Sequence, residues 1–383
     1  MGKNFTGKIK VLFFISSLEI GGAERVMLHI LRHLDRNRFL PILLLFYQYS
    51  ELPYSKYLPK DLKILVLQRK SESLTSKIKQ AVTFLLTIGK IKPDIIFSML
   101  THCNILALFG KLLFKTKIII TEHSTLSAII KTPDGAKILG LPVSFLVKTF
   151  YRFSDKIITV SEGVRDDLIE KFNISWEKIK NIPNPIDLEL ISQMKIKKAT
   201  HPFFEKSVPV IISVGRLVKA KGFDILLNSF KKVIKKIDAR MIIIGEGPEK
   251  NNLEILSKKL GISDKVSFIG FQENPFQFLA KGDLYVLSSR YEGMPLSLLE
   301  AMACGLPVIA FDCKSGPREI LKNGKFGILV PAGDEEKLTS SILELLMNYE
   351  LRLKMSVLSQ KRAEEFSAKN IIARYEKELA ELF

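Results

Sequence analysis

The sequence has few of the residues that build disulfide frameworks and metal sites. Among its 383 residues there are only three cysteines and five histidines. The cysteines, Cys103, Cys304 and Cys313, are odd in number and lack metal-ligand spacing, so we expect reduced thiols in a reducing compartment. The histidines also lack metal-ligand spacing, so we expect neither a metal nor another cofactor.

Longer patterns are missing as well. No run of about 20 uncharged apolar residues is present, which is the length that a membrane-spanning helix needs. The chain has neither the G-x-G-x-x-G turn of dinucleotide-binding folds nor a Walker A loop. These absences argue against a transmembrane protein, a dinucleotide-dependent enzyme and a P-loop enzyme.

The chain carries an excess of basic residues. Lysine and arginine number 58 against 40 aspartates and glutamates, a formal net charge of +18 with a pI of about 9.6. Such a surface attracts nucleic acid, anionic lipid or phosphorylated substrates, and the charge alone does not choose among them. A hydrophobic content of 47% predicts well-packed cores, and the length predicts two domains.

Expected buried strands alternate with helical segments along the chain. Their continuous Ile, Val and Leu runs are typical of parallel strands covered on both faces. The first set is Lys10–Ser16, Pro41–Phe46, Asp94–Ser98, Lys117–Thr121 and Lys156–Val160. The second set is Val208–Val214, Arg240–Ile244, Lys265–Ile269, Leu284–Ser288 and Pro307–Phe311. The stretch Asn181–Pro209 between the two sets is interpreted as a linker.

This alternation predicts an α/β protein of two doubly wound, Rossmann-like parallel-sheet domains that face a cleft. We expect an N-terminal domain over residues 1–190 and a C-terminal domain over residues 191–367. A final helical segment within residues 368–383 is expected to pack back on the first domain. Ligands of such sheets bind at the carboxyl ends of strands, so the turns at those ends are the candidate site.

Three strand-to-helix turns suit anionic ligands. Gly21 and Gly22 allow the backbone to approach a phosphate at a helix start, although paired glycines are also common in plain loops. Arg216 and Lys221 follow the first strand of the second set, where they either neutralise a diphosphate or belong to a solvated basic loop. Gly245 opens the turn GEGPEKNNL, which suits either a backbone contact with a nucleotide or an ordinary loop.

The segment TEHS places Glu122 and His123 at the carboxyl end of another strand. A histidine in that position can donate a hydrogen bond to a ligand or shuttle a proton. A histidine satisfied by a backbone carbonyl is the alternative.

The segment RYEGMPLSLLEAMACG holds two glutamates eight positions apart. Glu292 precedes a helix expected to start at Pro295, and Glu300 lies inside that helix among apolar residues, where an unpaired carboxylate is costly. Eight residues of continuous helix rise ~12 Å, more than the ~5–9.5 Å between the paired carboxyls of glycosidases. The spacing therefore favours two binding groups on one long ligand. Amides at the helix start also suit hydroxyls or phosphate, and they belong to Gly293, Met294 and Leu296.

Together these segments resemble the retaining GT-B glycosyltransferases of family four. The similarity rests on GGAER, TEH, VSEGVRDDL, IPNPID, VGRLVKAKGFDILL, IIIGEGP and EGMPLSLLEAMACGLPVIA, in this order and across nearly the whole chain. It implies that the first domain holds the acceptor and the second the nucleotide sugar. It also implies transfer with retention, in which the departing phosphate helps to deprotonate the acceptor.

The resemblance assigns roles to individual residues. Arg216 and Lys221 would hold the donor diphosphate, Glu300 the ribose hydroxyls and Glu292 the transferred sugar, while His123 would lie near the reacting carbon. The implied catalytic residues are His123, Arg216, Lys221 and Glu292. The implied donor-binding residues are Gly22, Arg216, Lys221, Gly245, Gly293, Met294, Pro295, Leu296 and Glu300.

Two further positions match the family on the acceptor side. Gly21 stands beside Gly22, whose amide would reach the phosphates. Asn184 lies in IPNPID, where Pro185 follows it at a position that is often glycine in the family.

Three basic, apolar segments bear on the acceptor. Residues 73–92, 108–117 and 145–156 mix lysines with aliphatic and aromatic residues. Such segments suit the face of an anionic membrane, or simply helices that cover a sheet. We predict a cytoplasmic protein bound peripherally to the inner face of the cytoplasmic membrane, with a lipid-linked or nascent glycan acceptor. The similarity to enzymes of bacterial lipopolysaccharide and capsule synthesis favours a UDP-N-acetylhexosamine donor, with UDP-hexose and GDP-mannose open.

Two other functions stay open. A GT-B nucleotide-sugar 2-epimerase would act on the donor alone, and the pairing of two glutamates with Arg216 and Lys221 favours transfer over it. A nucleic-acid-binding protein would suit the net charge. No helix-turn-helix, RNA-recognition or zinc pattern is present, so we expect no nucleic-acid partner.

Overall fold

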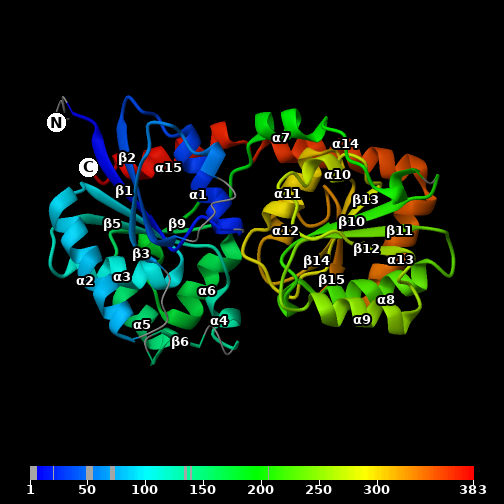
Figure 1. Cartoon of the computed structure of the whole chain (residues 1–383), viewed down its shortest axis with the longest axis horizontal. Coiled ribbons are helices and arrows are strands. Elements are labelled where there is room, and N and C mark those ends of the chain that lie inside the picture. The colour runs from blue at the N-terminus through cyan, green and yellow to red at the C-terminus, as the bar shows by residue number, and fades with distance from the viewer. Residues whose placement is uncertain are drawn as a thin grey trace. The chain divides into compact units, whose positions relative to one another are not determined.

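The computed structural model describes residues 7–19, 21–48, 55–69, 74–132, 136–138, 140–205 and 207–383. The chain divides into two compact units, one formed by Met1–Pro185 with Ala368–Phe383 and the other by Ile186–Ser367. Each unit is a central sheet covered by helices (Figure 1). The predicted fold class, two Rossmann-like parallel-sheet domains, is confirmed.

The first unit is built on a sheet with the strand order β3-β2-β1-β4-β5-β8-β9, in which each pairing is parallel. Its strands are β1 (Ile9–Ile15), β2 (Phe39–Gln48), β3 (Lys63–Arg69), β4 (Ile95–Met99), β5 (Lys117–Glu122), β8 (Lys156–Thr159) and β9 (Ile179–Asn181). The run VLFFI in β1 is fully buried, because helices cover both faces of the sheet.

Two helical layers enclose this sheet. The first layer is α2 (Leu74–Ile91), α3 (Thr101–Lys111), α5 (Val143–Phe150) and α6 (Glu162–Phe172). It shares one core with Leu12 and Phe14 of β1. Side chains alternate between the faces of a strand, so Phe13 points to the other side. There its ring lies 5.3 Å from that of Phe97, which in turn contacts Tyr375 of the second layer. That layer is α1 (Gly22–His33) and α15 (Ala368–Ala380).

The C-terminal helix α15 is tied to the first unit by polar contacts. Lys156 on β8 forms ion pairs with Glu378 and with Glu381, the latter at 3.0 Å. The backbone N–H of Asp35 donates to Glu376 at 2.7 Å. Shorter elements complete this unit: η1 (Ser55–Tyr57), α4 (Leu126–Ile129), β6 (Lys137–Ile138), β7 (Leu141–Pro142), η3 (Tyr151–Phe153) and η4 (Trp176–Lys178).

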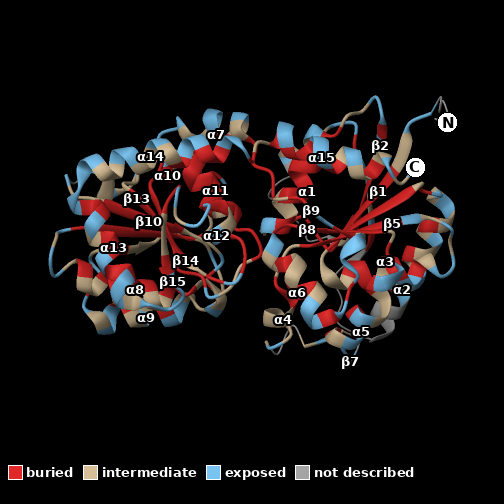
Figure 2. Ribbon diagram, turned by 180° about the vertical axis from the view of Figure 1, so that it is seen from behind, coloured by how far each residue is buried: buried red, intermediate tan, exposed pale blue. Residues whose placement is uncertain are grey.

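The second unit has a parallel sheet with the order β12-β11-β10-β13-β14-β15. Its strands are β10 (Val210–Val214), β11 (Arg240–Ile244), β12 (Val266–Phe268), β13 (Leu284–Leu287), β14 (Val308–Asp312) and β15 (Ile328–Pro331). One face shares a core with α8 (Phe223–Val233), α9 (Lys250–Leu260) and α13 (Glu335–Met347). The remaining helices are α7 (Leu188–Lys195), α10 (Phe276–Leu279), α11 (Leu296–Ala303), α12 (Pro317–Ile320) and α14 (Tyr349–Glu364), with η5 (Pro202–Glu205) and η6 (Lys219–Lys221). Figure 2 shows the strands of both units buried and the outer helix surfaces exposed.

Three strands of the two parallel sheets are not predicted by the sequence patterns, and neither are the two-residue strands β6 and β7. The three are β3, whose run KILVLQR carries charge at both ends, and the short strands β9 and β15. Few residues and flanking charges leave little periodic signal, so only pairing with a neighbouring strand reveals them.

The predicted linker at 181–209 is partly wrong. It contains α7, which Asp187 caps by accepting from the N–H of Leu190 at 2.9 Å. This helix packs on α10 and α11, and Asn274 donates to the carbonyl of Met194 at 2.9 Å. The boundary between the units therefore follows Pro185 rather than residue 190.

Candidate active site

In the second unit, the topology brings two turns together. β10 and β13 are neighbours in the sheet, but the chain leaves β10 toward β11 on one side and β13 toward β14 on the other. The helices that follow, α8 and α11, therefore diverge to opposite faces. The carboxyl ends of two such strands form the ligand-binding crevice of doubly wound sheets. The turns at this point are residues 215–222 and 288–295.

An ion pair joins these two turns. Lys221 Nζ lies 2.6 Å from Glu292 Oε1, with the side chains 24% and 9% exposed. Ser289 donates to the same Oε1 at 2.6 Å, and Ser315 donates to the carbonyl of Glu292 at 2.6 Å. The structure thus brings together two predicted site residues that lie 71 positions apart. Sequence reasoning missed the two serines. The sequence marks them only by their positions, Ser289 just after β13 and Ser315 just after β14.

The backbone of the two turns is equally close. Gly222 has a φ of 63°, and a Cβ on it would lie 2.1 Å from the carbonyl oxygen of Ser288. A residue with a side chain would therefore force the turns apart. Arg290 adds a further link, since its N–H donates to Ala220 O at 2.7 Å and its guanidinium contacts Lys219 O and Asp224.

Arg216 and Gly245 lie at the same edge of the second sheet. Arg216 follows β10 and is exposed. Gly245 follows β11 with a φ of 146°, and a Cβ there would lie 2.0 Å from the carbonyl oxygen of Gly215. The Gly245 N–H donates to Gly270 O at 2.9 Å, so this amide serves the fold. Close packing of two turns explains the glycine at this position.

The helix that carries Glu300 starts later than expected. α11 begins at Leu296, and Pro295 is its N-cap with extended ψ of 110°. The estimate of a ~12 Å rise for a continuous helix therefore does not apply, because residues 292–295 form a loop. Glu300 is buried within α11, at the edge where Tyr285 OH donates to Ser297 Oγ at 2.8 Å.

The loop before α11 is held against the turn after β14. Gly293, Met294 and Pro295 are buried. Gly316 has a φ of 88°, and a Cβ on it would lie 2.6 Å from the carbonyl oxygen of Gly293. This packing orients the N-terminus of α11, whose partial positive charge attracts anions.

In the first unit, β5 ends in a buried carboxylate. Glu122 accepts hydrogen bonds from Tyr151 OH and from Asn104 Nδ2, the latter at 3.0 Å. Burial raises the pKa of Glu122 to about 7, although hydrogen bonds from Tyr151, Asn104 and Thr101 favour its ionised form. Glu122 is therefore a group whose protonation changes near neutral pH. Sequence reasoning names it beside His123 but misses Tyr151 and Asn104.

His123 directly follows this carboxylate. Its Nε2 lies 3.0 Å from Thr121 Oγ1. Burial lowers its pKa to about 4, so the imidazole is neutral at physiological pH. Within the described part of the chain, its buried Nδ1 has no hydrogen-bond partner. A neutral imidazole with an unused nitrogen is suited to a hydrogen bond with a ligand.

The remaining predicted residues also belong to the first unit. Gly22 is the exposed first residue of α1, and Gly21 is its N-cap. A Cβ on Gly21 would lie 2.0 Å from Glu24 Oε2, so glycine there admits a carboxylate over the helix start. Asn184 is buried just before the end of this unit.

Among the residues described, no group of three or more His, Cys, Asp or Glu side chains could hold a metal ion. No helix formed by these residues combines the length and apolar character needed to cross a membrane.

Two family models match the chain. The model "Glycosyltransferase Family 4" covers residues 20–190, and "Glycosyl transferases group 1" covers residues 195–362. The matched ranges together include all of the predicted site residues.

Curated proteins and solved structures agree with these models. The N-acetylgalactosamine-N,N'-diacetylbacillosaminyl-diphospho-undecaprenol 4-alpha-N-acetylgalactosaminyltransferase of Campylobacter jejuni is 31% identical, over 93% of this chain and 95% of its own length. N-acetyl-alpha-D-glucosaminyl L-malate synthase of Bacillus anthracis is 28% identical, over 68% of this chain and 67% of its own. The Anabaena protein HepE, solved with UDP and glucose, has a TM-score of 0.81 at 20% identity, over 97% of this chain and 100% of its own.

Proposed function

The chain belongs to the family 4, group 1 glycosyltransferases, and from this premise we propose that it transfers an N-acetylhexosamine or hexose from a UDP-sugar, with retention, to a lipid-linked or nascent glycan. The enzyme would work at the inner face of the cytoplasmic membrane.

The Lys221–Glu292 ion pair is the observation that most supports a donor site in the second unit. Lys221 and the exposed Arg216 would neutralise the diphosphate as it departs with growing negative charge. The start of α11 would add its partial positive charge. When the diphosphate binds Lys221, the ion pair with Glu292 breaks, and the carboxylate of Glu292 then accepts hydrogen bonds from the sugar hydroxyls. Glu300, buried in the same helix, would bind the ribose hydroxyls.

Gly22 and His123, both in the first unit, would contact the donor phosphates and the transferred sugar. Gly22 lies exposed at the start of α1, where backbone amides suit phosphate. The neutral His123 would donate or accept a hydrogen bond at the sugar through its unused Nδ1. The acceptor oxygen would form its bond on the face that the diphosphate leaves, and its proton would pass to the departing phosphate oxygen.

The names of the relatives support a UDP-sugar donor and transfer with retention. HepE was solved with UDP, which supports a UDP-sugar. Two relatives are named for N-acetylhexosaminyl transfer, and both names specify alpha products. Common UDP-hexosamines are alpha-linked, so an alpha product means retention. The name of the Campylobacter protein includes a diphospho-undecaprenol, which supports a lipid-linked acceptor.

A nucleotide-sugar 2-epimerase is the second candidate, and no specific contact favours it. A calorimetric panel of UDP, GDP and ADP identifies the base, and turnover of the UDP-sugars with and without a polyprenyl-diphosphate-linked sugar identifies the reaction. We expect sugar release that depends on the acceptor. Epimerised donor in its absence would establish the alternative.

Variants locate the site. Glu300→Ala and Arg216→Ala should abolish donor use while the far-UV circular dichroism stays that of the wild type. Arg352→Ala is the matched control, because Arg352 also contacts carbonyls and a carboxylate, but at the amino-end edge of the same sheet, beside Asp283. Full turnover in Glu300→Ala or Arg216→Ala would refute the site.

A further inference from the structure

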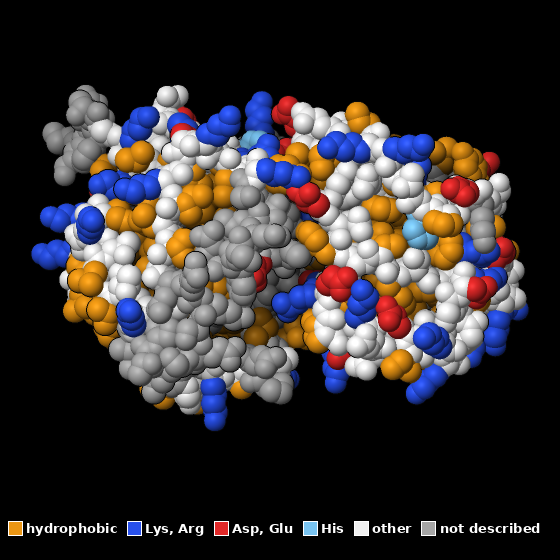
Figure 3. Space-filling view, viewed as in Figure 1, with side chains coloured by type: hydrophobic (Ala, Val, Ile, Leu, Met, Phe, Trp, Pro, Cys, Tyr) orange, Lys and Arg blue, Asp and Glu red, His pale blue; other side chains and the backbone are white. Residues whose placement is uncertain are grey.

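The first helical layer of the first unit has apolar side chains on its outer surface as well as on its inner one. A helix that covers a sheet ordinarily turns a polar face to solvent. Here the outer surface of α2, α3 and the turn after α3 carries Val82, Leu86, Phe109, Leu112 and Leu113, all exposed. We call these five residues the outer patch. In Figure 3, hydrophobic side chains with lysine or arginine around them gather over the edge of the unit where Figure 1 draws α2.

On α2 the patch forms a stripe along one helix face. Lys79, Val82, Leu86 and Lys90 are separated by three and four residues, so they share one side of the helix. All four are exposed, with Leu86 at 68%. Lysines at both ends of an apolar stripe can bury their methylene stems and keep their ammonium groups at a polar boundary. Phe84, on the opposite side, is fully buried, so the hydrophobic residues of this helix serve two different surfaces.

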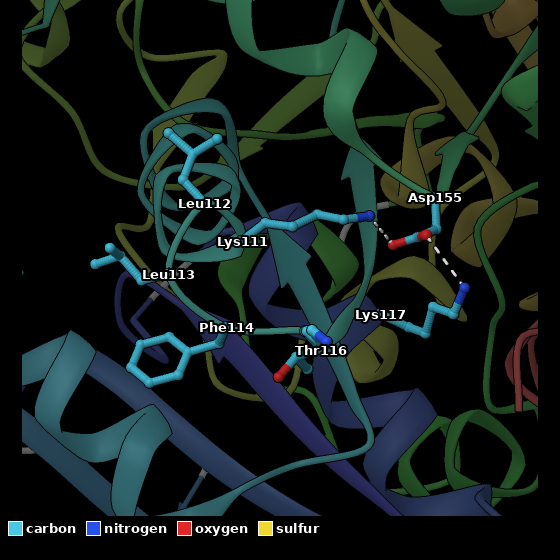
Figure 4. A pocket seen from close by; sticks show the side chains of 8 residues that line it. Lys111, Leu112, Leu113, Phe114, Thr116, Lys117 and Asp155 are labelled. Atoms are coloured by element: carbon cyan, nitrogen blue, oxygen red, sulfur yellow. Dashed lines mark hydrogen bonds and ion pairs between the residues drawn. The ribbon is translucent and has the colours of Figure 1, made fainter.

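After α3 a short turn holds two leucines away from the unit. Leu112 is 59% and Leu113 62% exposed. Lys111 and Lys117 reach toward Asp155, which pairs with both, while Leu112 and Leu113 point away from it (Figure 4). Asp155 therefore offsets about half of the charge of these two lysines within the protein, and the two leucines between them are exposed. A pocket lies behind the tip of the turn, lined by residues 111–117 and Asp155.

The stripe and the turn belong to one continuous surface. A Cβ on Gly110 of α3 would meet Ile88 and Phe84 of α2 at 3.3 and 3.4 Å. One on Gly89 of α2 would meet Phe114 of the turn at 3.5 Å. The two helices therefore pack side by side with little space between them.

The charge of this surface selects its partner. Residues 74–117 contain seven lysines and one acidic residue, Asp94, and Asp155 adds a second carboxylate beside Lys111 and Lys117, so positive charge remains in excess. Anionic lipids attract such a segment by about 1 kcal/mol for each lysine near the surface. Nucleic acid would satisfy the lysines but would leave the leucines of the turn in water. A second copy of this surface would bring like charges together.

We propose that the outer patch docks the first unit on an anionic lipid bilayer. Leu86, Leu112 and Leu113 enter the headgroup region, and Lys79 and Lys90 contact anionic headgroups. The inference deepens the proposed function, since a lipid-linked acceptor is reached at the surface on which the first unit rests.

Cosedimentation of the full chain with phosphatidylcholine vesicles, with and without phosphatidylglycerol, tests the proposal. The wild type should bind only the anionic vesicles, and less at high salt. The double variant Leu112→Ser/Leu113→Ser should bind about tenfold to a hundredfold more weakly, because each leucine loses part of its transfer free energy. Leu353→Ser/Val357→Ser, at exposed positions on α14 of the second unit, is the matched control and should bind like the wild type.

Three results would overturn the docking surface. They are no binding of the wild type to anionic vesicles at low salt, equal weakening by both double variants, or a wild-type dimer that Leu112→Ser/Leu113→Ser converts to monomer. Calorimetry with UDP and transfer to a short-chain, water-soluble acceptor are run on the same proteins. These readouts report the proposed function alone, so its failure is distinguishable from failure of the docking surface.

Arg290 carries a second inference, independent of the first. Its guanidinium donates to Lys219 O at 2.6 Å and to the two carboxylate oxygens of Asp224 at 2.8 and 2.7 Å. Its backbone N–H donates to Ala220 O at 2.7 Å. Arg290 alone thus holds the turn after β10 at Lys219 and Ala220, and the start of α8 at Asp224. Lys221 is the next residue of that turn.

We infer that Arg290 is a positioning residue for the donor site, which rests on the proposed function. Arg290→Ala should raise the Kd for UDP and the KM for the donor about tenfold, as expected for lost charge-assisted hydrogen bonds, with a smaller change in kcat. Arg290→Lys keeps the charge but not the forked geometry, so its donor KM should lie between that of the wild type and that of Arg290→Ala.

The control again is Arg352→Ala, which should leave the donor KM unchanged. If the wild type binds UDP and Arg290→Ala binds it equally well, the positioning role is wrong. A wild type that binds no nucleotide contradicts the proposed function instead. A uniform loss of kcat in Arg290→Ala with unchanged KM would also contradict positioning of the donor.

Discussion

Replacing Glu292 by glutamine separates two roles of the Lys221–Glu292 pair. In the structure the ammonium of Lys221 forms an ion pair with the carboxylate of Glu292, at 2.6 Å. A donor diphosphate must compete for that ammonium. Glu292→Gln removes the competing charge, so we expect UDP to bind more tightly while sugar transfer becomes slower.

The magnitude follows from the geometry. A hydrogen bond between charged groups contributes about 1.5–3 kcal/mol, and partial exposure of Lys221 reduces this to about 1–2 kcal/mol. At 1.4 kcal/mol for each factor of ten, the Kd for UDP should fall about fivefold to thirtyfold. Loss of the contact between the carboxylate and the sugar should lower kcat/KM about tenfold to a hundredfold.

Calorimetric titration with UDP and initial rates with the UDP-sugar measure the two effects. Ser289→Ala is the matched control, because it removes a neutral hydrogen bond to the same Oε1 and leaves the charges in place. Its UDP affinity should stay close to that of the wild type. If Glu292→Gln leaves UDP affinity unchanged or weakens it, the competition between carboxylate and diphosphate is refuted.

Three other predictions concern the fold and its pH dependence. Gly222→Ala should lower the free energy of unfolding by more than the ~1 kcal/mol that a left-handed residue costs, because its Cβ would also clash with the carbonyl oxygen of Ser288. Gly261→Ala, at a similar φ but in open space, should show the ~1 kcal/mol cost alone. Equal losses of the two variants in urea denaturation would contradict the clash. The pKa of Glu122 rises from 4.5 to about 7 on folding, so the unfolded chain binds fewer protons and stability should fall by about 3 kcal/mol as pH rises through that interval. Glu122→Gln should flatten this slope in urea titrations, and an unchanged slope would assign it to other groups. The pKa of His123 falls from 6.5 to about 4, so stability should drop as pH falls between those values, and His123→Gln should lose that drop, as measured by thermal unfolding.

The strand cores could be predicted from the sequence because burial on both faces leaves a local record. The segment RMIII of β11 is predicted with the bounds that the structure has, since continuous β-branched residues suit a covered parallel strand. β9 has three residues and no such record. A strand of that length exists because β8 supplies its hydrogen bonds, so its signal lies in another part of the chain.

The outer patch shows the same limit on a helix. Phe84 and Leu86 are both large and apolar, and the sequence treats them alike. The structure buries Phe84 completely in the core shared with β1 and leaves Leu86 mostly exposed. Only the direction of each side chain relative to the sheet separates a residue that stabilises the fold from one that is free to meet a membrane.

The kinds of residue at the strand ends could be predicted from the sequence alone: cations after β10, glutamates around α11 and a histidine after β5. These depend on spacing along the chain, which is local. The tertiary structure decided their partners. Lys221 meets Glu292 because β10 and β13 are neighbours where the strand order reverses, and Glu122 titrates near neutral pH because the fold buries it. Contact and desolvation depend on distance in space, and that distance is set only when the sheet is assembled.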